Sequence, residues 1–200
     1  MGQLKAPIDE RSVHLCIDMQ RLFTAAGPWP TPWMERVAPL VASLVAKRPE
    51  RTIFTRFIPP RTPDDASGMW RPYYRKWECA TLAKLDPALL ELIPELAPYA
   101  LPAHVFDKPV YSAFSTGRLH SFLRAKDIST LIITGSETDV CVLATVLSAV
   151  DLGYRIVLVQ DGLCSSSDEA HDALTNLYAK RFDIQIELAD MASILEFWRA

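Results

Sequence analysis

The chain has 200 residues, 50% of them hydrophobic and 22% charged, and its 21 Lys and Arg against 24 Asp and Glu give a formal net charge of −3. This composition is too apolar for a disordered chain, and the length predicts one domain over residues 1–200. Without excess basic charge, nucleic acid is not an expected partner. No apolar run is long enough to span a bilayer, and the N-terminus lacks the apolar core of a signal peptide, so we expect no membrane partner and a cytoplasmic location.

Short apolar runs rich in β-branched residues alternate with helical patterns along the chain. Strands are predicted at residues 12–19, 51–56, 103–107, 130–134, 155–160 and 183–188. Helices are predicted at about residues 33–47, 86–96, 116–126, 141–152, 167–181 and 190–198. Because several strands are nearly continuous apolar runs, we expect a three-layer α/β/α fold with an open, mostly parallel sheet of about six strands.

Residues 57–85 are the least regular part of the sequence. This insert is rich in proline and contains an aromatic cluster: Trp70, Tyr73, Tyr74 and Trp77. A long loop of this kind in a compact domain usually has a function or packs as a cover.

The four cysteines and four histidines are scattered, with no CxxC, HxH or HExxH pair. This spacing predicts neither a disulfide framework nor a zinc site, so we expect no metal and no cofactor. Cys16 lies inside a predicted strand, and Cys79 and Cys164 are likewise expected to be small buried residues.

Three reactive side chains are predicted to lie at or just beyond strand ends. Ligands of open α/β sheets bind outside the carboxyl ends of the strands, so such residues are candidates for a site. Asp18 ends the first strand, although a turn former is the alternative interpretation. Lys108 follows the strand 103–107, where the alternative is an ordinary solvated lysine.

Cys141 falls in the first turn of the helix after the strand 130–134, and Thr138 or Asp139 is placed to cap that helix. A thiol at a helix N-terminus should ionise more readily than a free cysteine. The alternative is a small buried residue. With Asp18 and Lys108, Cys141 would complete a set of nucleophile, proton acceptor and orienting cation. No histidine follows a strand in this way, which argues against a Cys-His pair.

Three motifs resemble those of the isochorismatase-like cysteine hydrolases. HLCIDMQRLFT contains Asp18 followed by Gln20 and Phe23, FDKPVYSAF contains Lys108, and GSETDVCVLATVLSAVDLGYRIVLVQDGLCSSS contains Cys141. The three occur in the family's order and spacing, and the resemblance runs from about residue 11 to residue 195.

The resemblance implies a hydrolase that cleaves a C–N bond of a small amide or carbamoyl compound through a thioester on Cys141. Asp18 would take the thiol proton and Lys108 would hold Asp18. The resemblance also implies a non-proline cis peptide at Ser136–Glu137, which helps to shape an oxyanion hole with the amides of Val140 and Cys141 as donors. Family members are commonly dimers or tetramers, so a homodimer or homotetramer is expected.

One departure from the family bears on the substrate. The nicotinamidase branch binds zinc through an Asp and two His after the second strand, whereas the corresponding stretch here, TRFIPPRTPDDASG, has no His. We therefore expect neither a zinc site nor nicotinamidase activity. Arg56 is a candidate for binding a substrate carboxylate, and Glu137 is a candidate for touching substrate. The candidate pocket residues are Phe23, Arg56, Trp70, Tyr74, Trp77 and Tyr111, with a packed lid or a subunit contact as the alternative for the aromatic ones.

Two other functions stay open. A vinyl-ether hydrolase of isochorismatase type would share the fold without needing the thiol, and a non-catalytic subunit would bind a small molecule without turning it over. Near the C-terminus, Phe197 and Trp198 are expected to be exposed and are candidates for a subunit contact, with packing inside the chain as the alternative.

Overall fold

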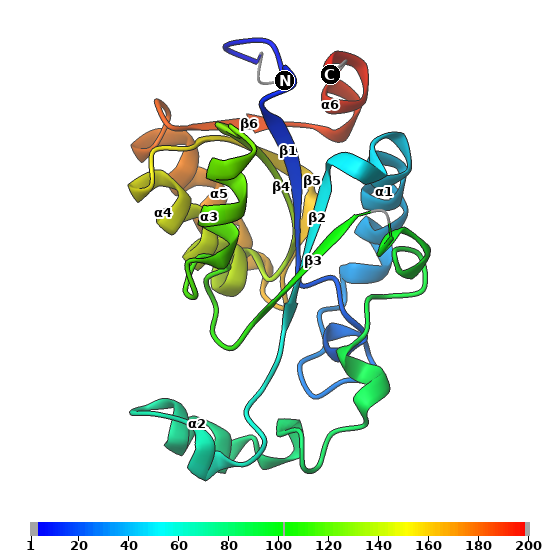
Figure 1. The fold of residues 1–200 in the computed structure, drawn as a ribbon, viewed down its shortest axis with the longest axis vertical. Helices are drawn as coiled ribbons and strands as arrows, with labels where there is room; N and C mark the ends of the chain where they lie inside the picture. The colour runs from blue at the N-terminus through cyan, green and yellow to red at the C-terminus, as the bar shows by residue number, and fades with distance from the viewer. Residues whose placement is uncertain (1–3, 102, 199–200) are drawn as a thin grey trace.

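Six strands, all parallel, form the central sheet of the protein (Figure 1). The computed structural model describes residues 4–101 and 103–198. In chain order the strands are β1 (Ser12–Ile17), β2 (Thr52–Phe57), β3 (His104–Lys108), β4 (Thr130–Ser136), β5 (Arg155–Cys164) and β6 (Ile186–Ala189). They lie side by side in the order β3-β2-β1-β4-β5-β6. The predicted parallel sheet of about six strands is confirmed.

Helices cover both faces of this sheet. In chain order they are α1 (Met34–Lys47), α2 (Trp70–Lys76), α3 (Arg118–Ala125), α4 (Leu143–Asp151), α5 (Asp168–Arg181) and α6 (Met191–Phe197). Figure 1 shows α3, α4 and α5 on one face and α1 and α6 on the other, which gives the predicted three layers. In the described ranges, no helix is both long and apolar enough to cross a membrane.

The two middle strands are buried on both faces, which explains their continuous apolar sequences. All six residues of β1 and all seven of β4 are buried. Leu119 of α3 and Val146 of α4 belong to the apolar cluster on one face, and Leu44 of α1 and Ile194 of α6 belong to a cluster on the other. Parallel sheets need this two-sided cover because their crossover connections place helices on the faces.

The C-terminal turn packs inside the chain. Trp198 is fully buried in the apolar cluster that contains Ile8, Leu44 and Ile194, and it forms a β-bridge with Ile8. The prediction that Trp198 is exposed is therefore wrong, because its indole fills the space between the two ends of the chain. Phe197 is 49% exposed, as expected.

The predicted helix at 86–96 is wrong. The segment contains only a 3₁₀ turn, Pro87–Leu90, although Asp86 caps it as expected by accepting a hydrogen bond from the Ala88 amide at 2.9 Å. Pro94 cannot donate an intrahelical hydrogen bond. The amide of Ile93 instead donates to the carbonyl oxygen of Met19 at 3.0 Å, so pairing with the chain after β1 replaces the helix.

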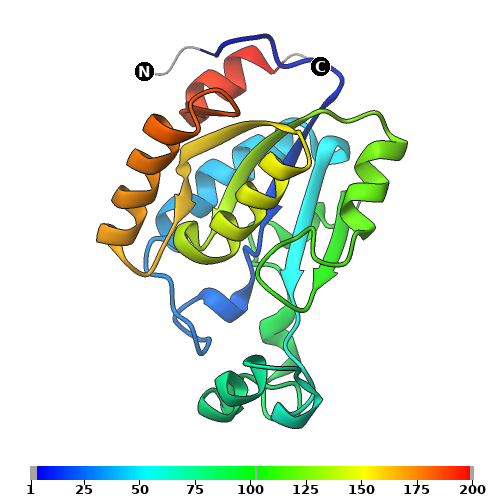
Figure 2. The same cartoon turned by 90° about the vertical axis from the view of Figure 1, so that its left-hand side faces the viewer.

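The insert at 57–85 is more ordered than its sequence predicted. It contains α2 and two 3₁₀ turns, Pro63–Asp65 and Glu78–Ala80. Pro72 is tolerated in α2 because it lies in the first turn, where its missing amide would have no partner. Figure 2 shows α2 standing beyond the carboxyl ends of the strands, at the end of the molecule opposite α6.

Strands β1 and β4 approach each other closely at Gly135, which pairs with Ile17. A Cβ atom on Gly135 would lie 2.1 Å from the backbone oxygen of Ile17, and Gly135 has a φ of +119°. Only glycine accepts both conditions. The strand order reverses between these two strands, which is where open α/β sheets bind ligands.

We predict that Gly135→Ala is strongly destabilising, because the added Cβ forces β4 away from the β1 backbone. Gly153→Ala is the matched control, since Gly153 also has a positive φ, of +81°, but nothing lies within 4 Å of its Cβ position. The control should lose only the backbone strain, about 1–3 kcal/mol. The measurement is the free energy of unfolding in urea. Equal losses in the two variants would contradict the close approach.

Candidate active site

A buried ion pair joins the ends of β1 and β3. Lys108 is the last residue of β3, and its Nζ lies 2.7 Å from Oδ2 of Asp18, the residue after β1. The two side chains are 2% and 0% exposed, so Lys108 is not a solvated surface lysine. Burial alone would lower the pKa of Lys108, but the charge of Asp18 raises it above its ordinary value.

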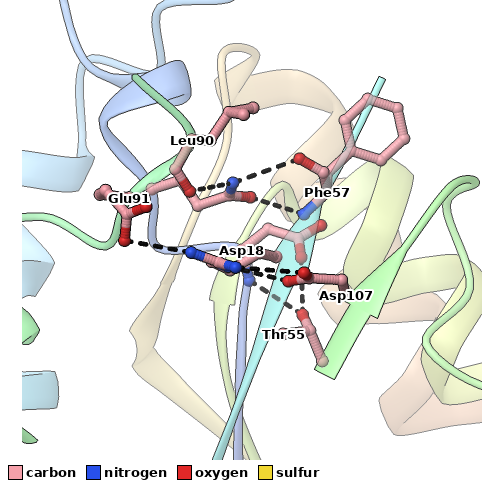
Figure 3. A network of polar contacts seen from close by, with 8 residues as sticks. Asp18, Thr55, Phe57, Leu90, Glu91 and Asp107 are labelled. Atoms are coloured by element: carbon pink, nitrogen blue, oxygen red, sulfur yellow. Dashed lines mark hydrogen bonds and ion pairs between the residues drawn. The ribbon is translucent and has the colours of Figure 1, made fainter. Parts of the chain in front are cut away.

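Thr55 of β2 orients the carboxylate of Asp18 (Figure 3). The Thr55 hydroxyl donates to Oδ1 of Asp18 at 2.6 Å, and the Asp18 amide donates to that hydroxyl oxygen at 3.2 Å. Asp18 has a φ of +49°, in the left-handed region that Asp tolerates better than most residues. Thr55 was not among the predicted site residues, because its role follows only from β2 lying beside β1.

Cys141 lies in a π-helical turn, Thr138–Val142, that connects β4 to α4. Neither predicted cap forms. The Thr138 hydroxyl donates to the carbonyl oxygen of Cys164 at 3.2 Å, and Asp139 accepts a hydrogen bond from the Ser165 hydroxyl at 2.6 Å. Thr138 therefore ties the turn to the last residue of β5, and Asp139 ties it to the residue that follows.

The Cys141 thiol is close enough to Asp18 and Lys108 to respond to both charges. Burial raises the pKa of Cys141 well above its ordinary value, Asp18 raises it further, and Lys108 lowers it. The expectation of a readily ionised thiol is therefore wrong, since burial and the charge of Asp18 raise its pKa more than Lys108 lowers it. The resting thiol is protonated near neutral pH and needs a base, and Asp18 is the carboxylate beside it.

The turn before Cys141 is held by the loop after β5. The backbone amide and hydroxyl of Ser166 both donate to Oε2 of Glu137, at 3.1 and 2.5 Å. The peptide bond between Ser136 and Glu137 is cis. The Val140 amide donates to the carbonyl oxygen of Glu137 at 3.0 Å. It is therefore already engaged, which contradicts its predicted role as an oxyanion donor.

A cavity of about 100 Å³ opens at Cys141, and its walls are mainly aromatic. The lining residues are Phe23, Trp29, Phe57, Tyr73, Tyr111, Glu137, Val140 and Cys141. Phe23 and Tyr111 lie where the sequence placed them. Trp29 and Phe57 were missed because loop residues after β1 and at the end of β2 carry no pattern that distinguishes them from core residues.

The other aromatic residues predicted to line this pocket lie elsewhere. Trp70 and Tyr74 line a second cavity of about 500 Å³ beside Lys108. These two residues are one helical turn apart on α2, so their rings stack on the same side, with centres 6.0 Å apart. Trp77 packs edge-on against Trp29, with ring centres 5.9 Å apart, and does not line the Cys141 pocket.

Arg56 is not available to bind substrate. Its guanidinium forms a bidentate pair with Asp107, at 2.8 and 3.1 Å, and donates to Glu91 at 3.0 Å. The two carboxylates thus hold the guanidinium between β3 and the segment after the insert. The prediction of Arg56 as a pocket residue is wrong, because β2 and β3 pair in register and place Arg56 beside Asp107.

Gln20 fixes the end of β2 relative to the segment after the insert. The Phe57 amide donates to Oε1 of Gln20 at 2.6 Å, and Nε2 of Gln20 donates to the Leu90 carbonyl oxygen at 2.8 Å (Figure 3). The side chain thus holds the base of the insert next to Asp18.

All four cysteines are free. Cys16 and Cys164 are fully buried as predicted, whereas Cys79 is exposed, which contradicts the prediction, because it lies on a surface turn after α2. Among the residues described, no group of three or more His, Cys, Asp or Glu is placed to hold a metal ion.

Comparison with known proteins supports one family. The family model of the isochorismatase domain matches residues 12–190. The chain is 32% identical over 114 residues to the nicotinamidase of Escherichia coli K12, which covers 52% of each protein. It is 42% identical over 72 residues to the ureidoacrylate amidohydrolase RutB of Cronobacter sakazakii, covering 36% of this chain and 30% of that protein.

A cysteine hydrolase from Pseudomonas syringae pv. phaseolicola 1448A has the same fold, with a TM-score of 0.79, 23% identity and 98% of both chains covered. The matches to the curated relatives are shorter. The chain spans 60% of the length of one relative from Bacillus subtilis and only 30% of the Cronobacter protein.

We predict that Lys108→Met destabilises the protein by about 3–5 kcal/mol, because it leaves the Asp18 carboxylate buried without its partner. The double variant Asp18→Asn/Lys108→Met should recover much of the loss, since neither charge remains. Arg11→Met, which breaks the exposed pair with Asp127, is the control and should change little. The free energy of unfolding at neutral pH is measured. If Lys108→Met lowers the free energy of unfolding no more than the control does, the claim that burial makes this ion pair essential is refuted.

We further predict the order in which the thiols react with iodoacetamide. Exposed Cys79 should be alkylated first, Cys141 in its small cavity later, and buried Cys16 and Cys164 last. Because the pKa of Cys141 is raised, its labelling should keep increasing as the pH rises through 9 and beyond. Peptide mass spectrometry of the wild type and of Cys79→Ser measures each site. Labelling of Cys141 that is complete and constant from pH 7 upward would contradict the raised pKa.

Proposed function

The chain belongs to the isochorismatase family, and from this premise we propose that it is a metal-independent cysteine hydrolase that cleaves the C–N bond of a small amide or carbamoyl compound. The observation that carries the proposal is the meeting of Asp18, Lys108 and Cys141 from three strand ends in one buried site. The names of its relatives, nicotinamidase and ureidoacrylate amidohydrolase, support a C–N bond as the target.

In the first half of the reaction, Asp18 takes the proton of the Cys141 thiol while Sγ forms a bond to the carbonyl carbon of the substrate. The carbonyl oxygen becomes an oxyanion. When it collapses, the C–N bond breaks and the nitrogen leaves with the proton that Asp18 returns. The acyl group remains on Cys141 as a thioester.

In the second half, a water molecule gives one proton to Asp18 and attacks the thioester carbon. The C–S bond breaks, and Asp18 returns that proton to the sulfur, which restores the resting enzyme. Lys108 holds Oδ2 of Asp18 throughout and stabilises negative charge as it passes between the carboxylate and the sulfur. Thr55 holds the other carboxylate oxygen, so the carboxylate keeps its direction while it takes and returns the proton.

Two expectations accompany this proposal. The family resemblance implies a homodimer or homotetramer, and the sequence predicts a cytoplasmic location; both stay predictions. The absence of His from the stretch after β2 supports a reaction without zinc.

We predict that Cys141→Ala abolishes ammonia release from a panel of primary amides and ureido compounds, with a loss of at least about 10³-fold in kcat, because the nucleophile and its base act as a unit. Cys79→Ala is the matched control and should keep wild-type activity, since Cys79 is exposed and outside the pocket. In the wild type, mass spectrometry should detect an acyl adduct on Cys141 that hydroxylamine removes.

Three outcomes would contradict the proposal. Full ammonia release by Cys141→Ala would show that the thiol is not the nucleophile. Hydrolysis of a vinyl ether by both the wild type and Cys141→Ala, with no ammonia released from the amide panel, would indicate the vinyl-ether hydrolase alternative, which does not need the thiol. Saturable binding of panel compounds without ammonia release or an adduct would indicate a non-catalytic binding subunit.

A further inference from the structure

The charge of the Cys141 pocket carries an inference about the substrate. Five of the eight lining residues are aromatic: Phe23, Trp29, Phe57, Tyr73 and Tyr111. Glu137 is the one acidic side chain among the lining residues, and none of them is basic. The pocket is therefore an aromatic enclosure with one carboxylate.

Glu137 keeps a carboxylate oxygen for a ligand. Ser166 donates both of its hydrogen bonds to Oε2, and in the described part of the chain no donor reaches Oε1. Burial raises the pKa of Glu137, while the two bonds from Ser166 favour its ionised form. The turn that carries Cys141 thus also presents a carboxyl group to the cavity, held in place by Ser166.

Two cations near this site, Lys108 and Arg56, are already paired with carboxylates. Lys108 pairs with Asp18 at 2.7 Å. Arg56 is held between Asp107 and Glu91. A carboxylate on the substrate would therefore meet Glu137 and aromatic faces, with no basic side chain among the residues that line the cavity.

The aromatic walls continue outward from the cavity. A hollow of about 200 Å³, lined by Met69, Trp70, Tyr73 and Tyr111, shares Tyr73 and Tyr111 with the cavity at Cys141. A substrate whose carbonyl lies at Cys141 would thus have these two rings beside its other end. Aromatic faces attract cations, and aromatic enclosures recognise ammonium groups.

We propose that the substrate is a small amide bearing a cationic or quaternary ammonium group, bound by the aromatic walls and Glu137, and that carboxylate-bearing amides are rejected. This inference rests on the proposed function for the reacting end of the substrate and adds the chemistry of the other end. The absence of basic lining residues distinguishes this pocket from one that would bind an acidic ureido compound.

The test compares three primary amides of similar size. Betaine amide is cationic, tert-butylacetamide (3,3-dimethylbutanamide) is its neutral isostere, and malonamate is anionic. We expect betaine amide to have the highest kcat/KM, by at least about tenfold over the neutral isostere, with malonamate the poorest. Binding to Cys141→Ala, measured by calorimetry, should give the same order without any need for turnover.

Glu137→Gln keeps the shape of the side chain and an acceptor for Ser166 but removes the charge. It should reduce the preference for betaine amide over tert-butylacetamide by at least about fivefold. Tyr73→Leu, on α2, is a second variant that should also weaken this preference. Glu196→Gln, an exposed change of the same charge on α6, is the matched control and should leave the preference unchanged.

The outcomes separate the two proposals. Tighter binding of betaine amide to Cys141→Ala with no ammonia released by the wild type would refute the cysteine hydrolase while supporting the cation site. Equal or tighter binding of the neutral or anionic amide would overturn the cation site. So would an unchanged preference in both Glu137→Gln and Tyr73→Leu.

Discussion

The buried ion pair between Asp18 and Lys108 is the constraint on which the rest of the site depends. Two opposite charges removed from water are tolerated only if they are held together and supported by further hydrogen bonds. Thr55 and the carbonyl oxygen of Val110 supply those bonds. The sheet order satisfies this need, because β2 lies between β1 and β3 and brings Thr55 beside Asp18. Cys141 follows β4, which lies on the other side of β1, so the three side chains come together from both sides of β1.

The fold was predictable because the sheet is covered on both faces. Continuous apolar runs such as β1 and β4 can only be buried strands in a chain of this length. Asp18, Lys108 and Cys141 were predictable for the related reason that parallel strands deliver their following residues to one edge. The predicted helix at 86–96 does not form, because Pro94 cannot donate an intrahelical hydrogen bond and Ile93 pairs with Met19. The pairing with Met19 is a tertiary contact, which local helical patterns do not contain.

The pocket was less predictable than the three reactive side chains. Phe23 and Tyr111 lie within recognisable motifs, but Trp29 and Tyr73 reach the cavity through the path of loops and the placement of α2. Arg56 and Cys141 show a second limit. Sequence position suggested that Arg56 is a free cation, but Asp107 on the neighbouring strand pairs with it. It also suggested that the Cys141 thiol has a low pKa, but burial raises that pKa. Such charge balances depend on partners that are distant in the chain.

The insert has an evolutionary consequence. Its helix α2 contributes Tyr73 to the pocket, yet it stands beyond the strand ends and contributes no strand to the sheet (Figure 2). Substitutions there can recontour the entrance without disturbing the charges between β1, β3 and β4. Substrate preference can therefore change during evolution through substitutions in this short projecting segment, while Asp18, Lys108 and Cys141 stay the same.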